Sequence, residues 1–148
     1  MKKKSKKKLS QAKLLKKYEK IMKPIILARD GNRCQLKNYR VSCGPYLCMD
    51  HRPAKRGKHA TFFDPRNLTT VCTIHNQQAE YDPFVNDAIL AVVRKREGSK
   101  IIEILEAESR AIKKWASDEI EKWIEECRAY FAVEKHGRPE YARPYLKG

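Results

Sequence analysis

Long apolar runs are missing from this sequence of 148 residues, and their absence excludes several classes of protein. The longest apolar stretches, near 25–28 and 88–93, fall far short of the ~20 residues that a membrane-spanning helix needs. The lysine-rich start is not followed by the apolar segment of a secretory signal, so the pattern does not indicate export. We therefore expect a cytoplasmic protein.

Acidic residues are scarce relative to basic ones. The chain has 18 Asp and Glu against 33 Lys and Arg, which gives a net charge of +15 at pH 7. Such an imbalance favours a polyanionic partner, either nucleic acid or an anionic membrane surface. Residues 1–20 carry ten Lys and one Glu, hence +9, and the other 128 residues carry the remaining +6.

The basic segment 1–9 is of low complexity, and we expect it to be a disordered tail. It can attract DNA phosphates without sequence preference, which predicts a steep salt dependence of binding, or it can serve only as a solubilising tail. A membrane role is disfavoured because residues 10–22 carry few large apolar anchors.

The rest of the pattern predicts a small α+β protein, because a hydrophobic fraction of 41% suffices for a small core. We expect a basic helix over 10–30, kinked or restarted at Pro24. The segment 31–82 is expected to form a core of short β structure and one short helix. Apolar residues at helical spacing predict a helical region over 83–137, followed by an extended tail over 138–148.

Cysteine and histidine gather between residues 34 and 76. In a reducing compartment cysteines are more often thiol ligands or buried thiols than disulfides. Cys72 and His75 have the spacing of two ligands that reach one ion, and a structural zinc ion needs two more nitrogen or sulfur ligands. We take these to be Cys34 and Cys43, with Cys48 as the substitute. The alternative is a set of buried thiols beside a surface histidine.

A second set of polar residues follows the same segment in order: Asp50-His51, Asn67 and Asn76. The expected order of strand, loop, strand and helix brings these side chains together. Asp50 and Asn76 supply oxygen ligands that suit Mg²⁺ or Mn²⁺. A neutral His51 can deprotonate an attacking water, and Asn67 can orient the loop and the histidine through hydrogen bonds. These residue types suit metal-assisted hydrolysis of a phosphodiester.

At these positions the sequence resembles the HNH (ββα-metal) nucleases built on a zinc knuckle. The residues that carry the resemblance are Cys34, Cys43-Gly44, Met49-Asp50-His51, Pro53, Arg66-Asn67-Leu68, Cys72 and His75-Asn76. The resemblance implies that His51 is the general base, that Asn67 holds the loop, and that Asp50 and Asn76 bind the catalytic ion. The knuckle departs from the family pattern, because Cys34 and Cys43 are nine residues apart and His75 replaces a cysteine.

A closer resemblance, over roughly residues 18–135, is to the phage NinG (Rap) recombination nucleases. It is carried by the segments 51–57, 63–67 and 72–76 and by the helical C-terminal region. It implies a DNA endonuclease that nicks branched recombination intermediates such as Holliday junctions. It also implies a 3′-hydroxyl and a 5′-phosphate at the cut, and a location in the host-cell cytoplasm if the chain is phage-encoded.

Basic side chains in and after the loop 52–63 are candidates for phosphate contacts in the bound DNA. They are Lys55, Arg56, Lys58 and Arg66. His59 in the same loop can be a metal ligand or a phosphate contact, or it can be solvated. Resolution of a four-way junction needs two nicks, so a homodimer is possible. The apolar stripe over 120–131 can be its interface or an internal core.

Two further classes of function stay open. The basic tail and the Cys/His cluster would equally serve a zinc-stapled DNA-binding module without catalysis, for which the order of Asp50, His51, Asn67 and Asn76 is not required. An HNH nuclease with another role, in homing, restriction or packaging, or one that acts on RNA, fits the same residues.

Overall fold

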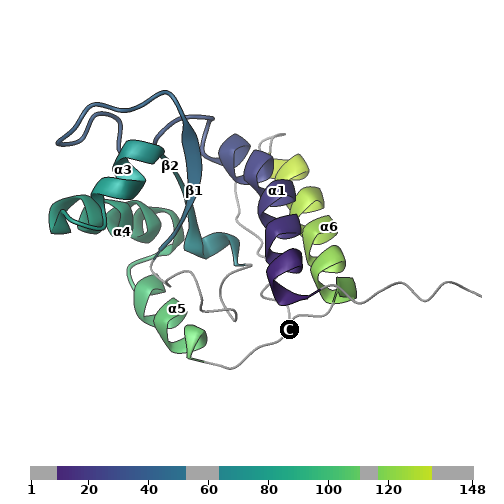
Figure 1. Cartoon of the computed structure of the whole chain (residues 1–148). Coiled ribbons are helices and arrows are strands. Elements are labelled where there is room, and N and C mark those ends of the chain that lie inside the picture. The colour runs from purple at the N-terminus through teal and green to yellow at the C-terminus, as the bar shows by residue number, and fades with distance from the viewer. Residues whose placement is uncertain (1–9, 53–63, 111–116, 135–148) are drawn as a thin grey trace, which may run out of the picture. The chain divides into compact units, whose positions relative to one another are not determined.

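The computed structural model describes residues 10–52, 64–110 and 117–134, and it shows an α+β protein whose described strands form one two-stranded sheet (Figure 1). Its elements are α1 (Gln11–Arg29), β1 (Leu47–His51), the 3-10 helix η1 (Pro65–Asn67), β2 (Leu68–Cys72), α3 (Thr73–Gln78), α4 (Pro83–Glu97), α5 (Ile101–Ser109) and α6 (Ser117–Glu134). Within the described ranges no helix has the length and apolar character needed to cross a membrane. The expected α+β class is confirmed.

The chain divides into two compact units, and the division falls within α1. One unit is Lys23–Lys113, and the other combines Met1–Met22 with Lys114–Gly148. In the second unit α1 and α6 lie side by side, and Lys17 donates to Glu121 at 3.3 Å (Figure 1). Among the described residues of this unit, the buried side chains are those of Tyr18, Met22, Ile120 and Ile124. The first half of the stripe predicted over 120–131 is therefore core.

The boundaries of α4 (Pro83–Glu97) follow sequence signals. The Asp82 side chain accepts a hydrogen bond from the main-chain N–H of Phe84 at 2.9 Å, which caps α4. Gly98, with a φ of 106°, ends the same helix. Pro24 behaves differently from the expectation of a restart, since α1 continues through it. Its ring lies on an exposed side of the helix, where water can hydrate the Lys20 carbonyl that loses its donor.

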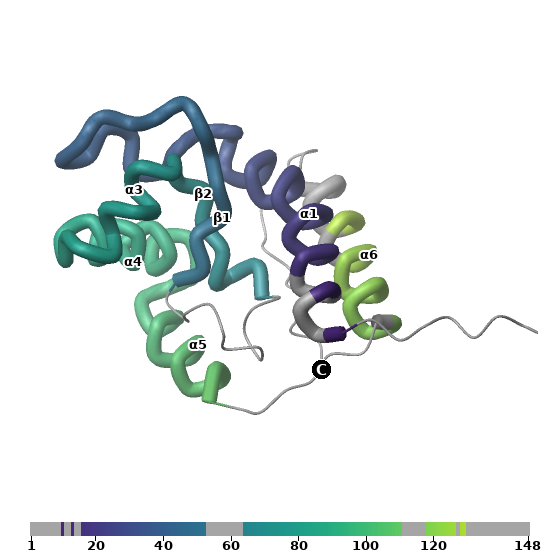
Figure 2. The backbone as a smooth tube through the Cα atoms, in the orientation of Figure 1, coloured from purple at the N-terminus to yellow at the C-terminus, as the bar shows by residue number. Residues whose placement is uncertain are grey.

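The long segment between α1 and β1 was expected to form irregular β structure, but it contains turns up to Tyr46 and only 47–51 is a strand. Figure 2 shows this segment as a loop that runs from the end of α1 past α3 and back into β1. Lys37, Asn38 and Arg40 in this loop have positive φ values of 24°, 58° and 60°. A backbone with several left-handed residues cannot lie in a sheet ladder, which explains the difference.

The two strands pair antiparallel, with Leu47 opposite Cys72 and His51 opposite Leu68. The register continues by one pair, because the Arg52 N–H donates to the Asn67 carbonyl at 3.0 Å. Asp64 starts the turn that feeds β2, since its carboxylate accepts from the Arg66 N–H at 3.0 Å. The hairpin therefore brings the end of β1 directly beside Asn67.

A main apolar cluster lies between the sheet and α4. It consists of Cys34, Leu36, Val71, Cys72, Ala79, Val85 and Ile89. A smaller cluster joins Val93 of α4 to Ile101, Ile102 and Leu105 at α5. Since burial of each large aliphatic side chain contributes about 1.5–3 kcal/mol, these clusters fix α4 against the hairpin and α5 against α4. The cysteines of the first cluster belong both to the core and to the candidate site.

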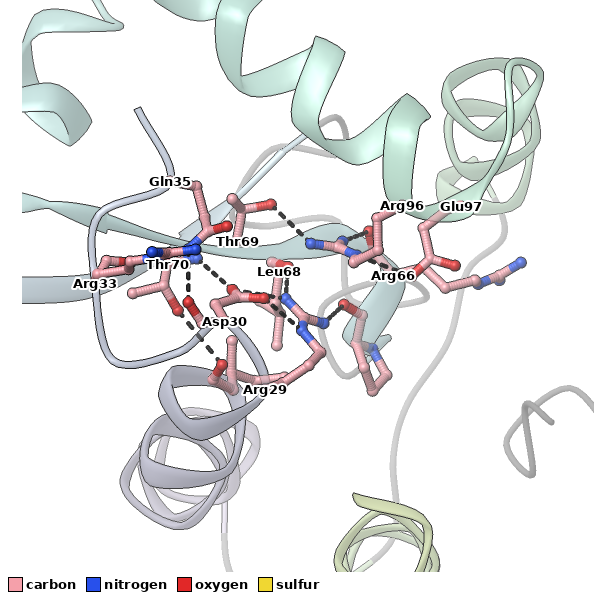
Figure 3. Close-up of polar contacts among 12 residues, drawn as sticks. Arg29, Asp30, Arg33, Gln35, Arg66, Leu68, Thr69, Thr70, Arg96 and Glu97 are labelled. Carbon is pink, nitrogen blue, oxygen red and sulfur yellow. Dashed lines mark hydrogen bonds and ion pairs between the residues drawn. The ribbon is translucent and has the colours of Figure 1, made fainter. Parts of the chain in front are cut away.

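A buried ionic clamp fixes the start of β2 (Figure 3). Arg29, the last residue of α1, donates to the carbonyls of Pro65 at 2.8 Å and Leu68 at 2.6 Å, and its guanidinium also pairs with Asp30 at 2.8 Å. Asp30 in turn accepts from the Thr70 N–H at 2.9 Å. Arg29 and Asp30 are 4% and 6% exposed, so the pair is withdrawn from solvent.

A second arginine approaches the same turn from α4. Arg96 donates to the Arg66 carbonyl at 2.9 Å and to the Thr69 hydroxyl at 3.4 Å, while it pairs with Glu97 at 2.9 Å (Figure 3). Burial lowers the Arg96 pKa, as does the neighbouring charge of Arg29, whereas Glu97 and Asp30 raise it. Two helices therefore hold the main chain on either side of Asn67.

Candidate metal centre

Three cysteines and one histidine converge where the long loop meets the end of the hairpin. Cys34 and Cys43 come from the loop, Cys72 ends β2, and His75 lies in the first turn of α3. One ligand atom from each of the four lies within 4.8 Å of the other three. A single metal ion with tetrahedral coordination needs this number and type of ligands.

The imidazole of His75 is oriented for this role. Its Nδ1 atom lies 3.1 Å from the Cys72 Sγ, 3.5 Å from the Cys34 Sγ and 3.7 Å from the Cys43 Sγ. Its Nε2 atom lies 2.8 Å from the main-chain carbonyl oxygen of Tyr39, which can only accept a hydrogen bond. The carbonyl therefore fixes the proton on Nε2 and leaves the Nδ1 lone pair for the ion, the usual arrangement of a metal-binding histidine.

Main-chain N–H groups point at the sulfur atoms. The Asn38 N–H lies 3.2 Å from the Cys43 Sγ, and the His75 N–H lies 3.4 Å from the Cys72 Sγ. The Asn38 side chain also accepts from the Cys43 N–H at 2.9 Å. This reciprocal pair holds the left-handed turn at Asn38 and aims Cys43 inward. Such donors favour thiolates over thiols, because they partly neutralise negative charge on sulfur.

The thiols differ in acidity. Burial raises the pKa of Cys34 to about 11, although the main-chain N–H groups of Cys72 and Leu36 lower it; the Cys43 and Cys72 side chains also act to raise it. For Cys72 burial also acts upward, but the N–H groups of His75 and Gly44 and the His75 ring bring the pKa down to about 7. Cys72 is therefore the ligand most ready to bind an ion as a thiolate, and a cation would ionise the others.

The four ligands predicted for zinc are the four that the structure brings together, and the cluster can hold a metal ion such as zinc. The predicted substitute, Cys48, is not among them. It lies in β1, where its thiol contacts the Val71 carbonyl at 3.5 Å, and burial raises its pKa to about 11. Cys48 packs against the same apolar cluster as Cys34 and Cys72, but its thiol is not one of the four converging ligands.

The second predicted set lies at the other end of the hairpin. Asp50 and His51 are the last residues of β1, and Asn67 directly precedes β2. The Asn67 carbonyl accepts from the Arg52 N–H, so Asn67 lies opposite Arg52 and is one position away from the residue opposite His51. Asn67 is buried and His51 is half-buried. Because successive side chains of a strand face opposite sides, Asp50 and His51 lie on opposite faces of β1.

Asp50 is 4% exposed, and its carboxylate is paired with Arg52. The Nε atom of Arg52 lies 3.1 Å from one carboxylate oxygen and 3.0 Å from the other. The other guanidinium nitrogens donate to Glu80 at 2.6 Å and to Asn86 at 3.0 Å. Burial raises the Asp50 pKa to about 6; the charge of Arg52 lowers it, and that of Glu80 raises it.

The fourth member of the set, Asn76, is half-buried in α3. Glu80 follows it by four residues, one helical turn further along the chain. Arg52 therefore ties the end of β1 to the turn that follows α3. Asp50 is a buried carboxylate that already has a cationic partner. Carboxylate and amide oxygens, such as those of Asp50 and Asn76, are ligand types that suit a hard divalent ion.

Of the four predicted phosphate contacts, only Arg66 belongs to the described residues. Lys55, Arg56 and Lys58, together with His59, lie outside the described residues. Arg66 is described and is 3% exposed. It forms short ion pairs with Asp64 and, at 2.8 Å, with Glu108 of α5. Its neighbours in the turn bury the guanidinium, so Arg66 joins α5 to η1 and does not present its charge to a ligand in this structure.

Two contributors to these sites were missed from the sequence. Tyr39 acts only through its carbonyl, which leaves no mark in the residue type. Arg52 stands directly after Asp50-His51, and its charge beside a buried carboxylate was the signal that could have found it. No family model, curated protein or solved structure matches the chain.

Proposed function

We propose that the chain is a metal-dependent DNA endonuclease of the HNH type, with the Cys₃His cluster as a structural zinc site. The observation that carries the proposal is the hairpin end: Asn67 lies opposite Arg52, the residue directly after Asp50-His51, and α3 follows β2 without a break. The basic excess of the chain supports a polyanionic substrate.

In this proposal the chain's own residues have separate tasks. His51 accepts a proton from the attacking water, and Asn67 holds the turn that faces His51. Asp50 and Asn76 hold Mg²⁺ or Mn²⁺ through oxygen atoms. The divalent ion, when bound, neutralises charge on the scissile phosphate and the leaving oxygen. The clamp of Arg29 and Arg96 keeps the Asn67 turn rigid, as a catalytic constellation requires.

The cluster and the hairpin end have complementary roles. The zinc ion would fix the loop 34–43 to the end of β2 and the start of α3, and so set the angle between hairpin and helix. That angle determines how α3, which carries Asn76, stands relative to Asp50. Loss of zinc is therefore expected to abolish cleavage through the fold rather than through the chemistry.

The test is cleavage of supercoiled plasmid by the zinc-loaded chain with Mg²⁺, with Mn²⁺ and without a divalent ion. The proposal predicts nicking with either ion, products with a 3′-hydroxyl and a 5′-phosphate, and no nicking without an ion. If the chain binds the plasmid and cuts it under none of these conditions, a zinc-stapled DNA-binding module without catalysis is the better account. The pairing of the Asp50 carboxylate with Arg52 is the observation that favours this second candidate.

Branched DNA is the proposed substrate, and the support for it is the resemblance to the phage recombination nucleases. The corresponding experiment compares cleavage of a four-way junction with that of a linear duplex of the same sequence. Faster cutting of the junction is expected. Equal rates would leave a nuclease of another role, and a preference for RNA strands would point to RNA processing.

A further inference from the structure

The Asp50 carboxylate, which the proposed function assigns to the divalent ion, already has a cation bound to it. The Nε–H of Arg52 donates to Asp50 Oδ1 at 3.1 Å, and the same nitrogen lies 3.0 Å from Oδ2, which has no hydrogen-bond partner among the described residues. The carboxylate is 4% exposed and the Arg52 side chain 14% exposed, so water screens the pair weakly. A buried carboxylate is costly unless a cation compensates it, and Arg52 supplies that compensation in the ion-free protein.

The same guanidinium is held at its other nitrogens. It donates to Glu80 at 2.6 Å, after α3, and to Asn86 at 3.0 Å, on α4. The planar guanidinium of Arg52 thus has three acceptors around it, which come from β1, from the turn after α3 and from α4. Arginine suits this geometry better than lysine does. The Glu80 side chain is 65% exposed, so this contact lies at the rim of the cluster.

We propose that Arg52 is the internal cation of the catalytic site, which occupies Asp50 until a divalent ion replaces it. The proposal rests on the proposed function, because it takes Asp50 as a ligand of that ion. Two cations at one buried carboxylate repel each other, so ion binding and the Asp50–Arg52 pair exclude one another. Arg52 is in this sense a positioning residue: it keeps Asp50 ordered and electrically balanced in the ion-free protein.

The exchange makes a prediction about the direction of an affinity change. Removal of Arg52 takes away a competitor, so Mn²⁺ should bind more tightly to the variant than to the wild type. A guanidinium that only supports the fold, or that helps to orient Asp50 for the ion, predicts unchanged or weaker binding. The sign of the change therefore separates this role from a structural one.

The experiment is titration of zinc-loaded, DNA-free protein with Mn²⁺ at pH 8, followed by electron paramagnetic resonance of the free ion. For Arg52→Gln we expect about tenfold tighter Mn²⁺ binding, because the ion no longer has to displace the charge-assisted hydrogen bond between Arg52 and Asp50. Arg52→Lys, which keeps the charge without the fork, should lie between the two. Unchanged or weaker binding by Arg52→Gln overturns the exchange.

A second variant covers the case in which Arg52→Gln does not fold. Asn86 is half-buried on α4 and accepts a hydrogen bond from the Arg52 guanidinium. Asn86→Ala removes this hydrogen bond and leaves Asp50 unchanged. It should bind Mn²⁺ about threefold more tightly, as the loss of one neutral acceptor predicts. An unchanged or weaker affinity of this variant also counts against the exchange.

Spectroscopy of the wild type gives a test without a change in the fold. The Nε–H resonance of Arg52, assigned through its loss in Arg52→Lys, should shift with Mg²⁺ and saturate together with ion binding. A resonance that stays unmoved at saturation overturns the exchange.

Asp50→Asn separates the two proposals. If it leaves Mn²⁺ binding unchanged, Asp50 is not a ligand, and both the ion site and the exchange fail. If it abolishes binding while Arg52→Gln does not strengthen it, the ion site stands and the exchange alone is wrong.

Discussion

The Nε2 atom of His75 lies 2.8 Å from the carbonyl oxygen of Tyr39, and this contact determines which ring nitrogen faces the three cysteines. Because a carbonyl can only accept, Nε2 carries the proton and Nδ1 is the atom available to a metal ion. Tyr39, which lies in the loop before β1, thereby sets the tautomer of His75 in α3.

This relationship predicts the nitrogen NMR spectrum of the zinc-loaded chain. His75 should appear as the Nε2–H tautomer with Nδ1 bound to the ion, and its Nε2 proton should be protected from exchange by the Tyr39 carbonyl. The matched substitution is His75→Cys, which offers one soft ligand at the same place and should retain zinc. A spectrum in which His75 remains a freely titrating imidazole in the presence of zinc would refute the assignment.

Zinc content and stability should depend on the loop cysteines and not on Cys48. Cys43→Ser is expected to lose the ion and to melt at a much lower temperature, because structural zinc contributes on the order of 10 kcal/mol of apparent folding free energy in small zinc-finger peptides. Cys48→Ser is the matched control, since its thiol lies in the core of β1 outside the cluster.

Elemental analysis beside thermal denaturation measures both quantities. One zinc per chain is expected for the wild type and for Cys48→Ser, and none for Cys43→Ser. Equal zinc content in the two variants would contradict the ligand assignment.

Stability should fall with rising pH on account of Asp50. Its pKa lies at about 6 in the folded chain and near 3.8 in an unstructured one, so the folded state binds the proton more tightly. The stabilising contribution of the proton is complete below about pH 4 and is lost as the pH rises through about 6. Between pH 5 and pH 7 the wild type should lose on the order of 1 kcal/mol relative to Asp50→Asn, which cannot titrate.

Urea denaturation of both proteins at the two pH values checks this difference. The zinc cluster is common to both, so its own response to pH cancels. A wild type that gains stability relative to Asp50→Asn over this interval would show that burial does not dominate the Asp50 environment.

The buried clamp at the Asn67 turn should contribute far more to the free energy of unfolding than a surface ion pair does. Arg29→Ala leaves Asp30 buried without its partner and frees two carbonyls, so we expect a loss of about 3–5 kcal/mol of unfolding free energy. The exposed pair of Lys17 and Glu121 offers the control, since Lys17→Ala should cost less than about 1 kcal/mol.

Arg29→Lys makes the same test more demanding. It keeps the charge, but one ammonium group cannot reproduce the four hydrogen bonds of the guanidinium, so it should recover only part of the loss. Full recovery would mean that charge alone, and not the fork, holds the turn.

The sequence predicted those parts of the structure that short-range residue preferences determine. Asp82-Pro83 starts α4 because an aspartate and a proline fit the first helical positions, and Gly98 ends it. The Cys72–His75 spacing led to the cluster, because a strand that passes into a helix presents both side chains to one point.

The parts that were missed depend on burial and on side-chain contacts that the residue types alone do not show. Arg66 was expected to meet DNA because it is basic and lies beside Asn67, but Asp64 and Glu108 bury it in ion pairs. Pro24 was expected to kink or restart the helix, and α1 continues through it without a restart. Arg52 follows Asp50-His51 directly, but its contacts with Glu80 and Asn86 become visible only when α3 and α4 are in place.

The central claim is that His51 activates the water that cuts DNA. The direct measurement is the single-turnover rate of plasmid nicking in Mn²⁺ by wild type and by His51→Ala, at equal zinc content and equal DNA affinity. Met49→Leu, a change two residues earlier on the same face of β1, is the matched control. We predict that His51→Ala slows nicking by about 10²- to 10⁴-fold, the contribution typical of a general base, while Met49→Leu keeps the wild-type rate. Equal rates for wild type and His51→Ala would contradict the account.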